Sequence, residues 1–229
     1  MVDVIMASLP ERDLNITLES VLKQPVVNNI YCLLNNYPSK EHLITDSKLS
    51  YIDRENEKGG TEKLYGLKLA TSEYVAILDD DLIIQDGYFE GLMRLAEKGY
   101  LASYHGRIFN KLPLTSYFRD NIARFHCLKY VPFDVQVDTI GSGVSMIKNG
   151  LLDRDTYDYV KYSDMCDIQL SFFAKIKGIE RWVAKHEEGF IKNIPYKYTV
   201  FKKYRKNHKH YTQFINDVWN INLANSTNQ

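Results

Sequence analysis

The stretch Tyr74-Val75-Ala76-Ile77-Leu78-Asp79-Asp80-Asp81 decides the fold class, because an apolar segment runs directly into three carboxylates. Its five apolar residues are typical of a buried strand. Three adjacent acids repel one another, so packing alone gives no reason for them to stand at a strand end. A divalent cation held by carboxylates and shared with substrate phosphates is the usual occupant of such a position. The alternative is a solvated turn whose acids favour the N-terminus of the next helix.

Strand-like and helix-like segments alternate before this stretch. Apolar runs predict strands at 2–7, 30–34 and 49–52. Amphipathic spacing from Leu14 predicts a helix that stops at Pro25, and Gly59-Gly60-Thr61 is predicted to open a second helix. The order strand, helix, strand, strand, helix, strand predicts an α/β fold with a mostly parallel sheet flanked by helices.

Ligands of such sheets bind at the carboxyl ends of the strands. One rim is therefore expected to collect polar residues that lie far apart in the sequence. These residues are Ser8 to Arg12, Asn35-Asn36, Arg54 and Asp79 to Asp81.

Two further helices are predicted in the second half of the chain. The first covers 85–98 and ends at Gly99, a residue suited to a helix C-terminus. The second is capped by Ser163 and ends at Gly178. Its predicted buried face consists of Met165, Ile168, Phe172 and Ile176.

The region between these helices has a weaker pattern. Residues 100–139 contain short strand-like pieces among many aromatic residues, and 140–147 resembles a turn that feeds a strand. No linker or repeat precedes the polar tail 222–229. A single domain over residues 1–229 is therefore expected.

Overall charge gives no sign of a charged partner, since Lys plus Arg and Asp plus Glu are 29 each. We accordingly expect no nucleic-acid partner. The cysteines, Cys32, Cys127 and Cys166, are widely spaced without a metal-ligand pattern, which indicates reduced thiols. Together with the lack of a secretory segment or a run of 18 apolar residues, this predicts a cytoplasmic location. The basic segment Lys202 to His210 is suited to peripheral contact with an anionic membrane surface.

Four groups of residues resemble, in order and spacing, the motifs of GT-A fold glycosyltransferases, most closely those of family 2. Ala7 to Arg12 and the helix after it resemble the first strand, turn and helix of that family. Gly59-Gly60 resembles its glycine turn, and Asp79-Asp80-Asp81 resembles its DxD motif. Asp167 to Ser171 resembles the segment with the catalytic acid. The resemblance covers about residues 2–190 and implies a Rossmann-like GT-A fold.

That resemblance implies an enzyme of polysaccharide biosynthesis that moves a sugar from a nucleoside-diphosphate sugar to a carbohydrate or other hydroxyl acceptor, with inversion. UDP is the expected nucleotide on family frequency alone. The nucleotide-binding half would be about 1–99 and the acceptor-binding half about 100–215. The basic segment Lys202 to His210 would alternatively close over the diphosphate.

Specific roles follow for residues that match the family's motifs. Mn²⁺ or Mg²⁺ would be held by Asp79, Asp81 and His186, and Asp167 would be the catalytic base. Asp164 lies three residues before Asp167 near the predicted helix start, and both side chains could face the cleft. The alternative for these two acids is an interaction with the helix macrodipole, and for His186 it is a structural or exposed residue. The nucleotide-sugar would be bound by Ser8, Leu9, Arg12, Asn35, Arg54, Lys63, Asp79 and Asp80.

The chain departs from the family pattern at three places. Asn35 replaces an acid at the end of the second strand, Cys166 replaces the Glu before Asp167, and the acceptor loop is reduced to Gly141-Ser142-Gly143. Two other classes remain as alternatives. One is a haloacid-dehalogenase-type phosphohydrolase, whose motif requires Thr or Val where this chain has Ile83. The other is a non-catalytic module that binds nucleotide-sugars or glycans.

Overall fold

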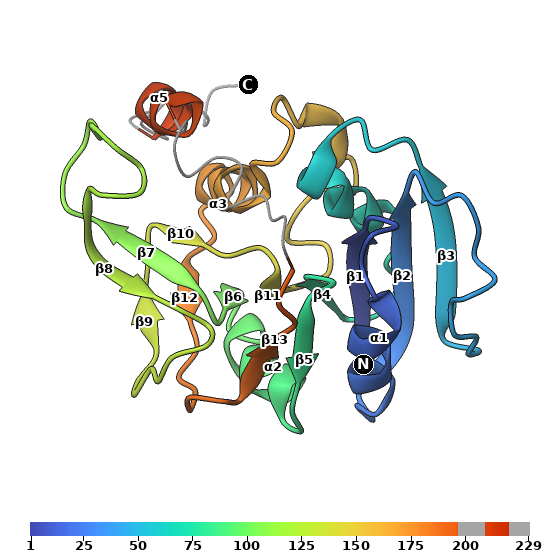
Figure 1. Cartoon of the computed structure of the whole chain (residues 1–229). Coiled ribbons are helices and arrows are strands. Elements are labelled where there is room, and N and C mark those ends of the chain that lie inside the picture. The colour runs from blue at the N-terminus through green and yellow to red at the C-terminus, as the bar shows by residue number, and fades with distance from the viewer. Residues whose placement is uncertain (197–208, 220–229) are drawn as a thin grey trace.

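A computed structural model describes residues 1–196 and 209–219 (Figure 1). The predicted tail 222–229 and all but the last two residues of the basic segment Lys202 to His210 lie outside the described residues. The elements follow one another as β1 (Val2–Ser8), α1 (Leu14–Leu22), β2 (Val27–Asn35), β3 (Leu49–Arg54), the 3₁₀-helix η1 (Gly59–Lys68), β4 (Tyr74–Leu78), β5 (Leu82–Ile84), α2 (Tyr88–Ala96), β6 (Leu101–Ser103), β7 (Gly106–Phe109), β8 (Asn121–Phe125), β9 (Val135–Gln136), β10 (Thr139–Ile140), β11 (Val144–Lys148), the 3₁₀-helix η2 (Thr156–Tyr159), α3 (Cys166–Ile176), β12 (Arg181–Val183), β13 (Ile191–Asn193) and α5 (Lys209–Val218).

The main sheet has eight strands in the order β3-β2-β1-β4-β11-β6-β12-β9. Its first four strands are parallel. β11 enters the middle of the sheet and is antiparallel to both β4 and β6. The predicted α/β fold with a mostly parallel sheet is confirmed, and it is consistent with the GT-A fold.

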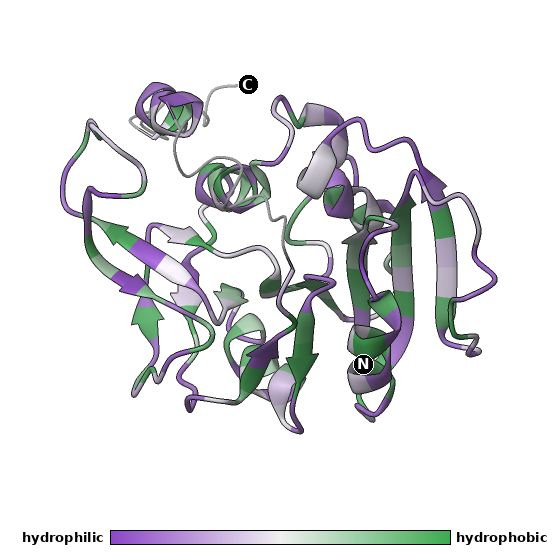
Figure 2. Ribbon diagram, viewed as in Figure 1, coloured by the Kyte–Doolittle hydropathy of each residue, from purple (hydrophilic) through white to green (hydrophobic). Residues whose placement is uncertain are grey.

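Helices cover both faces of this sheet because successive residues of a buried strand point to opposite sides. On one side Val4 and Met6 of β1 pack with residues of α1 and α2. On the other side Ile5 packs with residues of η1 and α3. In Figure 2, β1 and β4 are coloured as hydrophobic strands, as expected for strands buried on both faces.

Two small sheets flank the large one. β10, β7 and β8 form an antiparallel sheet, and β13 pairs with β5 directly after the three acids. A third apolar cluster lies beyond the first of these sheets, where Phe214 and Ile215 of α5 pack with Ile168 of α3 (Figure 1). The region 100–139, whose organisation the sequence pattern left open, therefore contains the short strands β6 to β9 and the start of β10, joined by longer irregular segments.

The start of α3 differs from the prediction. The helix begins at Cys166, and Met165, not Ser163, occupies the N-cap position. Asp164 adopts a left-handed conformation with φ of 57°, and its carboxylate accepts a 2.8 Å hydrogen bond from the backbone N–H of Gly60. This tertiary contact delays the helix. The predicted burial of Ile176 is also wrong, since its exposed fraction is 40%.

The helix α2 is shorter than the predicted 85–98, because Gly87 in a left-handed conformation occupies its N-cap position. The three cysteines are unpaired and buried, as predicted for reduced thiols. Within the described residues, no helix combines the length and apolar character needed to cross a bilayer.

Candidate active site

The second of the three acids, Asp80, holds the turn after β4 in place. Its side chain is buried, and Oδ2 accepts a 2.6 Å hydrogen bond from Ser8 Oγ at the end of β1. Its carbonyl oxygen accepts a 2.9 Å hydrogen bond from Thr17 Oγ1 on α1. Burial raises the pKa of Asp80, and the Ser8 hydrogen bond opposes this shift. Ser8 and Asp80 thus connect the turn to β1 and α1, and the predicted contact of Asp80 with the nucleotide-sugar stays a prediction.

The third acid, Asp81, shares the rim with Arg12. Arg12 Nη1 lies 3.4 Å from Asp81 Oδ2, and both side chains keep a small exposed fraction. Burial and the neighbouring carboxylates of Asp79 and Asp80 raise the pKa of Asp81 to about 7, although Arg12 acts in the opposite direction. The Arg12 guanidinium also lies 4.2 Å from the ring centroid of Tyr196. Among the described residues, cations therefore compensate the negative charge at this rim only in part.

The first acid, Asp79, faces the solvent side of the rim with 47% of its side chain exposed. Its Oδ1 accepts a hydrogen bond from Lys63 Nζ, which η1 brings to the rim. Burial alone would lower the pKa of Lys63, but the carboxylate of Asp79 outweighs it, so this pKa lies above its ordinary value. Lys63 therefore stays charged beside Asp79.

The predicted base, Asp167, lies in the first turn of α3 and is held by the segment between β10 and β11. Its Oδ1 accepts two hydrogen bonds from Ser142, one from the backbone N–H at 2.8 Å and one from Oγ at 2.6 Å. Within the described residues its Oδ2 accepts none. Because two donors fix one oxygen, the other oxygen has a defined direction.

The segment Gly141-Ser142-Gly143 joins these groups. A β-carbon on Gly143 would overlap the carboxylate of Asp79, and one on Gly141 would lie 2.8 Å from Cβ of His105. Ser142 between them binds Asp167. Only glycine permits these approaches, so this short loop sets the spacing between the acids after β4 and the acid on α3.

The geometry of this rim agrees with a comparison of the sequence with known families. Residues 4–157 match the model of glycosyl transferase family 2. The chain belongs to this family. No curated protein matches the chain. The family 2 match includes most of β1, the acids after β4 and the loop before β11, whereas Asp167 lies beyond its end.

One predicted nucleotide contact of this family 2 domain, Arg54, lies in an internal network. Its Nε is 3.1 Å from Glu62 Oε2, and its Nη2 donates a 3.0 Å hydrogen bond to Tyr157 Oη. The guanidinium also lies 4.2 Å from the ring centroid of Tyr65. These contacts hold β3 against η1 and η2, and the contact of Arg54 with the nucleotide stays a prediction.

Asn35 occupies a position suited to a ligand. It ends β2, it is buried, and its Oδ1 has no hydrogen-bond partner among the described residues. A buried acceptor without a donor is costly, so a donor from a ligand is expected there. Leu9 lies on the same rim, where its carbonyl accepts a 3.0 Å hydrogen bond from the backbone N–H of Arg12.

His186, the third predicted metal ligand, is held by backbone carbonyls. Its Nδ1 is 2.8 Å from the carbonyl of Ala184, and its Nε2 is 3.4 Å from the carbonyl of His126. It lines a pocket with Tyr104 and Phe190. No contact between His186 and either Asp79 or Asp81 exists in the described structure, so its role at that metal stays a prediction.

The chemistry of the rim fits a divalent cation at Asp79 and Asp81. Hard cations such as Mg²⁺ and Mn²⁺ prefer carboxylate oxygens. The raised pKa of Asp81, caused by burial and the adjacent acids, indicates an excess of negative charge that a cation would relieve.

Sequence analysis missed several residues that belong to the site. Ser142, which orients Asp167, lies 25 positions away in the chain, and no local pattern connects the two. The sequence pattern also gave no metal-ligand spacing for the cysteines, yet Cys127 forms a cluster with His105 and His126. Two adjacent residues of metal-ligand type, His126 and Cys127, were the signal in the sequence that could have indicated this cluster.

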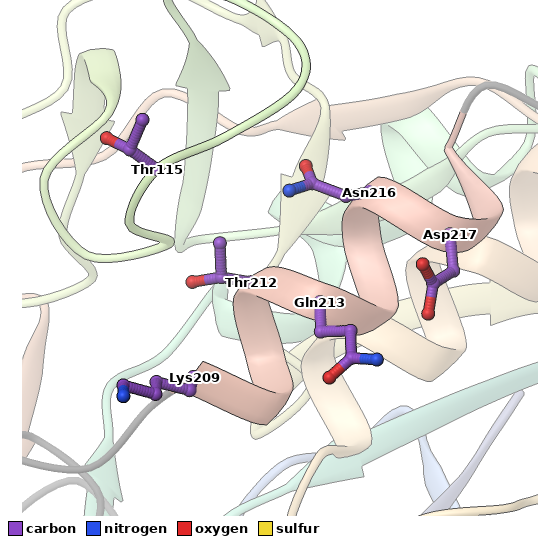
Figure 3. A pocket seen from close by; sticks show the side chains of 6 residues that line it. All are labelled: Thr115, Lys209, Thr212, Gln213, Asn216 and Asp217. Carbon is purple, nitrogen blue, oxygen red and sulfur yellow. The ribbon is translucent and has the colours of Figure 1, made fainter.

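A separate surface pocket lies between α5 and the loop at Thr115 (Figure 3). Its lining comes from Thr115 and five residues of α5, among them Lys209, Thr212 and Asn216. None of the candidate site residues lines it.

Proposed function

We propose that this protein transfers a sugar from a nucleoside-diphosphate sugar, with UDP as the expected nucleotide, to a hydroxyl group of a carbohydrate acceptor. The observation that carries this proposal is the loop Gly141-Ser142-Gly143, in which Ser142 contacts Asp167 and Gly143 contacts Asp79. A site for the leaving diphosphate and a base for the acceptor are thereby held side by side, as displacement at an anomeric carbon requires.

A Mn²⁺ or Mg²⁺ ion is proposed to bind Asp79 and Asp81. When bound, the ion supplies positive charge that neutralises the leaving diphosphate. Lys63 and Arg12 position the two carboxylates and add two fixed cations to the same rim. Phosphate oxygens are expected to bind these cations.

Asp167 is proposed to accept the proton of the attacking acceptor hydroxyl. Ser142 holds Oδ1, which leaves Oδ2 for the substrate. Attack from this side of the sugar, opposite the leaving diphosphate, inverts the anomeric configuration. A positioned carboxylate of this kind contributes about 10²- to 10⁴-fold to a rate.

Asn35 is proposed to recognise the nucleobase. Its unpaired buried Oδ1 accepts one hydrogen bond, and an N–H group on the edge of a base supplies it. Since Asn35 lies at the carboxyl end of β2, next to the end of β1, this contact belongs to the same rim as Ser8 and Asp80.

No observation favours the phosphohydrolase, because the acids follow the fourth strand of a family 2 domain. A non-catalytic nucleotide-sugar-binding module remains an outcome of the test. A cytoplasmic location, and membrane contact through Lys202 to His210, stay predictions.

A donor screen tests the proposal. Nucleotide release is measured for a panel of sugar nucleotides with Mn²⁺ and acceptor glycans, for the parent protein and Asp167→Asn. Metal-dependent release that Asp167→Asn abolishes supports the transferase. Metal-dependent thermal stabilisation by UDP without turnover on any donor would indicate a binding module. Hydrolysis of a phosphoester with no response to nucleotides would overturn the proposal.

A further inference from the structure

We propose that His105, His126 and Cys127 bind a zinc ion at a site separate from Asp79 and Asp81. One ligand atom from each of the three side chains lies within 4.8 Å of the others. Two imidazoles and one thiol form a donor set that zinc prefers and that Mg²⁺ avoids. This inference does not depend on the proposed transferase activity.

The β7–β8 pair brings the three ligands together. Gly106 of β7 pairs with Phe125 of β8 in the antiparallel register. One step beyond this pair, His105 faces His126, and their ring centroids are 4.9 Å apart. Cys127 follows His126 directly and is buried against the core. The three ligands therefore lie just outside the paired ends of β7 and β8, which limits their relative movement.

The ligand atoms have few competing partners. No hydrogen bond to the His105 ring exists among the described residues, and His126 Nδ1 meets only the backbone N–H of Leu128, at 3.2 Å. Zinc is bound in tetrahedral geometry, and a small movement of the three side chains toward one another would bring their ligand atoms to the required distances. Binding displaces the thiol proton of Cys127, so one proton is released for each zinc ion bound.

The cysteine is needed for charge as well as for its sulfur. Arg107 of β7 pairs with Arg124 of β8, two residues from His105 and His126 respectively. This pair places positive charge near the site. A thiolate ligand offsets part of the charge of zinc in such surroundings.

Further contacts hold the backbone around the proposed zinc ligands in place. His186 Nε2 lies 3.4 Å from the backbone carbonyl of His126, and the backbones of His186 and Val131 are paired at 2.9 Å. Gly141 packs on His105 from the other side. Three protein ligands leave a fourth tetrahedral position, which water occupies in this proposal.

The position of the site suggests what zinc does there. His105 lies against Gly141, and the next two residues of that loop contact Asp167 and Asp79. A zinc ion that ties β7 to the end of β8 therefore steadies the base of the loop that spaces the catalytic groups.

Metal analysis of the full chain tests this proposal. The protein is stripped with a chelator, reloaded with zinc or cobalt, and freed of excess metal. We expect one tightly bound ion for each chain, and a cobalt spectrum with a thiolate-to-metal charge-transfer band. Cys127→Ser and His105→Gln each should lower zinc affinity by more than about 10²-fold, because an outer-sphere change alone costs 10- to 100-fold.

Matched controls separate this site from others. Cys32→Ala removes a buried thiol outside the cluster, and His42→Gln removes an exposed histidine; both should keep the ion and the band. Asp81→Asn should also keep them, while it loses the response to Mn²⁺, so the two metal sites can fail independently.

Circular dichroism decides whether a variant is folded. If Cys127→Ser does not fold, His105→Gln carries the test. Three results would overturn the proposal: zinc below one-tenth of an equivalent after reloading, a cobalt spectrum without a thiolate band, or full zinc binding by folded Cys127→Ser. Zinc that raises the unfolding temperature of the parent but not of His105→Gln supports it.

Discussion

Gly143 lies so close to Asp79 that a β-carbon on the glycine would overlap the carboxylate. The backbone strengthens this contact, because Asp79 N donates a 2.9 Å hydrogen bond to the carbonyl of Gly143. The acids after β4 and the loop before β11 are therefore closely packed against each other, with no room for a side chain at position 143.

Replacement Gly143→Ala is expected to move the carboxylate of Asp79 and lower the transfer rate by about 10²-fold, the loss that a shift of about 1 Å can cause. Nucleotide release and Mn²⁺ titration measure the effect. Gly178→Ala is the control, since its cost lies in a positive φ with open space around it. That control should lose stability and keep activity. Equal activity of Gly143→Ala and the parent would contradict the proposed position of the metal.

Replacement Asp167→Asn is expected to keep donor affinity and the metal response while transfer falls by about 10²- to 10⁴-fold. The asparagine carbonyl can still accept both hydrogen bonds of Ser142, so the fold should persist. Calorimetry and initial rates separate binding from turnover. Slow donor hydrolysis should fall less than transfer. A product that retains the donor's anomeric configuration, as judged by NMR, would rule out Asp167 as the base of a single displacement.

Replacement Asp81→Asn is expected to stabilise the metal-free protein at pH 8 by about 1–3 kcal/mol. Burial and the neighbouring acids raise the pKa of Asp81 to about 7 from its ordinary value of 3.8, so ionisation costs stability as pH rises between these values. The gain in stability should be complete above pH 7 and should vanish below pH 3.8. Urea unfolding with a chelator at pH 8 and pH 4 measures it. A variant less stable than the parent at pH 8 would show that the Arg12 contact outweighs the repulsion among the acids.

Replacement Asp3→Asn is expected to destabilise the fold by about 2–3 kcal/mol at neutral pH. The asparagine side chain has one acceptor oxygen instead of two, so some of the buried donors around position 3 would lose their hydrogen bond. Asp3 Oδ2 accepts hydrogen bonds from the backbone N–H groups of Thr71 at 2.6 Å and Ser72 at 2.9 Å. Burial acts to raise the pKa of Asp3, but the hydrogen bonds from Ser72, Thr71 and Asn29 lower it overall.

The pH dependence of the free energy of unfolding that Asp3 causes is therefore opposite in sign to that caused by Asp81. Its stabilising contribution is complete above the ordinary value of 3.8 and is lost as pH falls through the lower folded-state pKa. Acid unfolding of the parent and the variant, followed by circular dichroism, should converge at low pH. A constant difference at every pH would assign the effect to packing.

Local patterns predicted the parts of this protein that depend on neighbouring residues. The strand 74–78 and the helix from Leu14 follow from apolar spacing, and both are present. Patterns could not decide among the three acids, because only the tertiary contact with Ser8 turns Asp80 inward. They misplaced the start of α3 for a similar reason, since Asp164 binds Gly60 from a distant segment.

The contacts that define the site join residues far apart in the chain. Ser142 meets Asp167, and Lys63 meets Asp79, through loops whose paths depend on the whole sheet. The cluster of His105 with His126 and Cys127 depends on the register of one strand pair, which a one-residue slip would destroy.

The position of β11 in the middle of the main sheet has a consequence for folding during synthesis. Until residues 144–148 have left the ribosome, one side of β4 has no partner, although all five of its residues are apolar and buried in the finished sheet. An unpaired apolar edge recruits other chains. A fragment that stops near residue 99 should therefore aggregate during expression, and only chains long enough to supply β11, the antiparallel neighbour of β4, should be soluble.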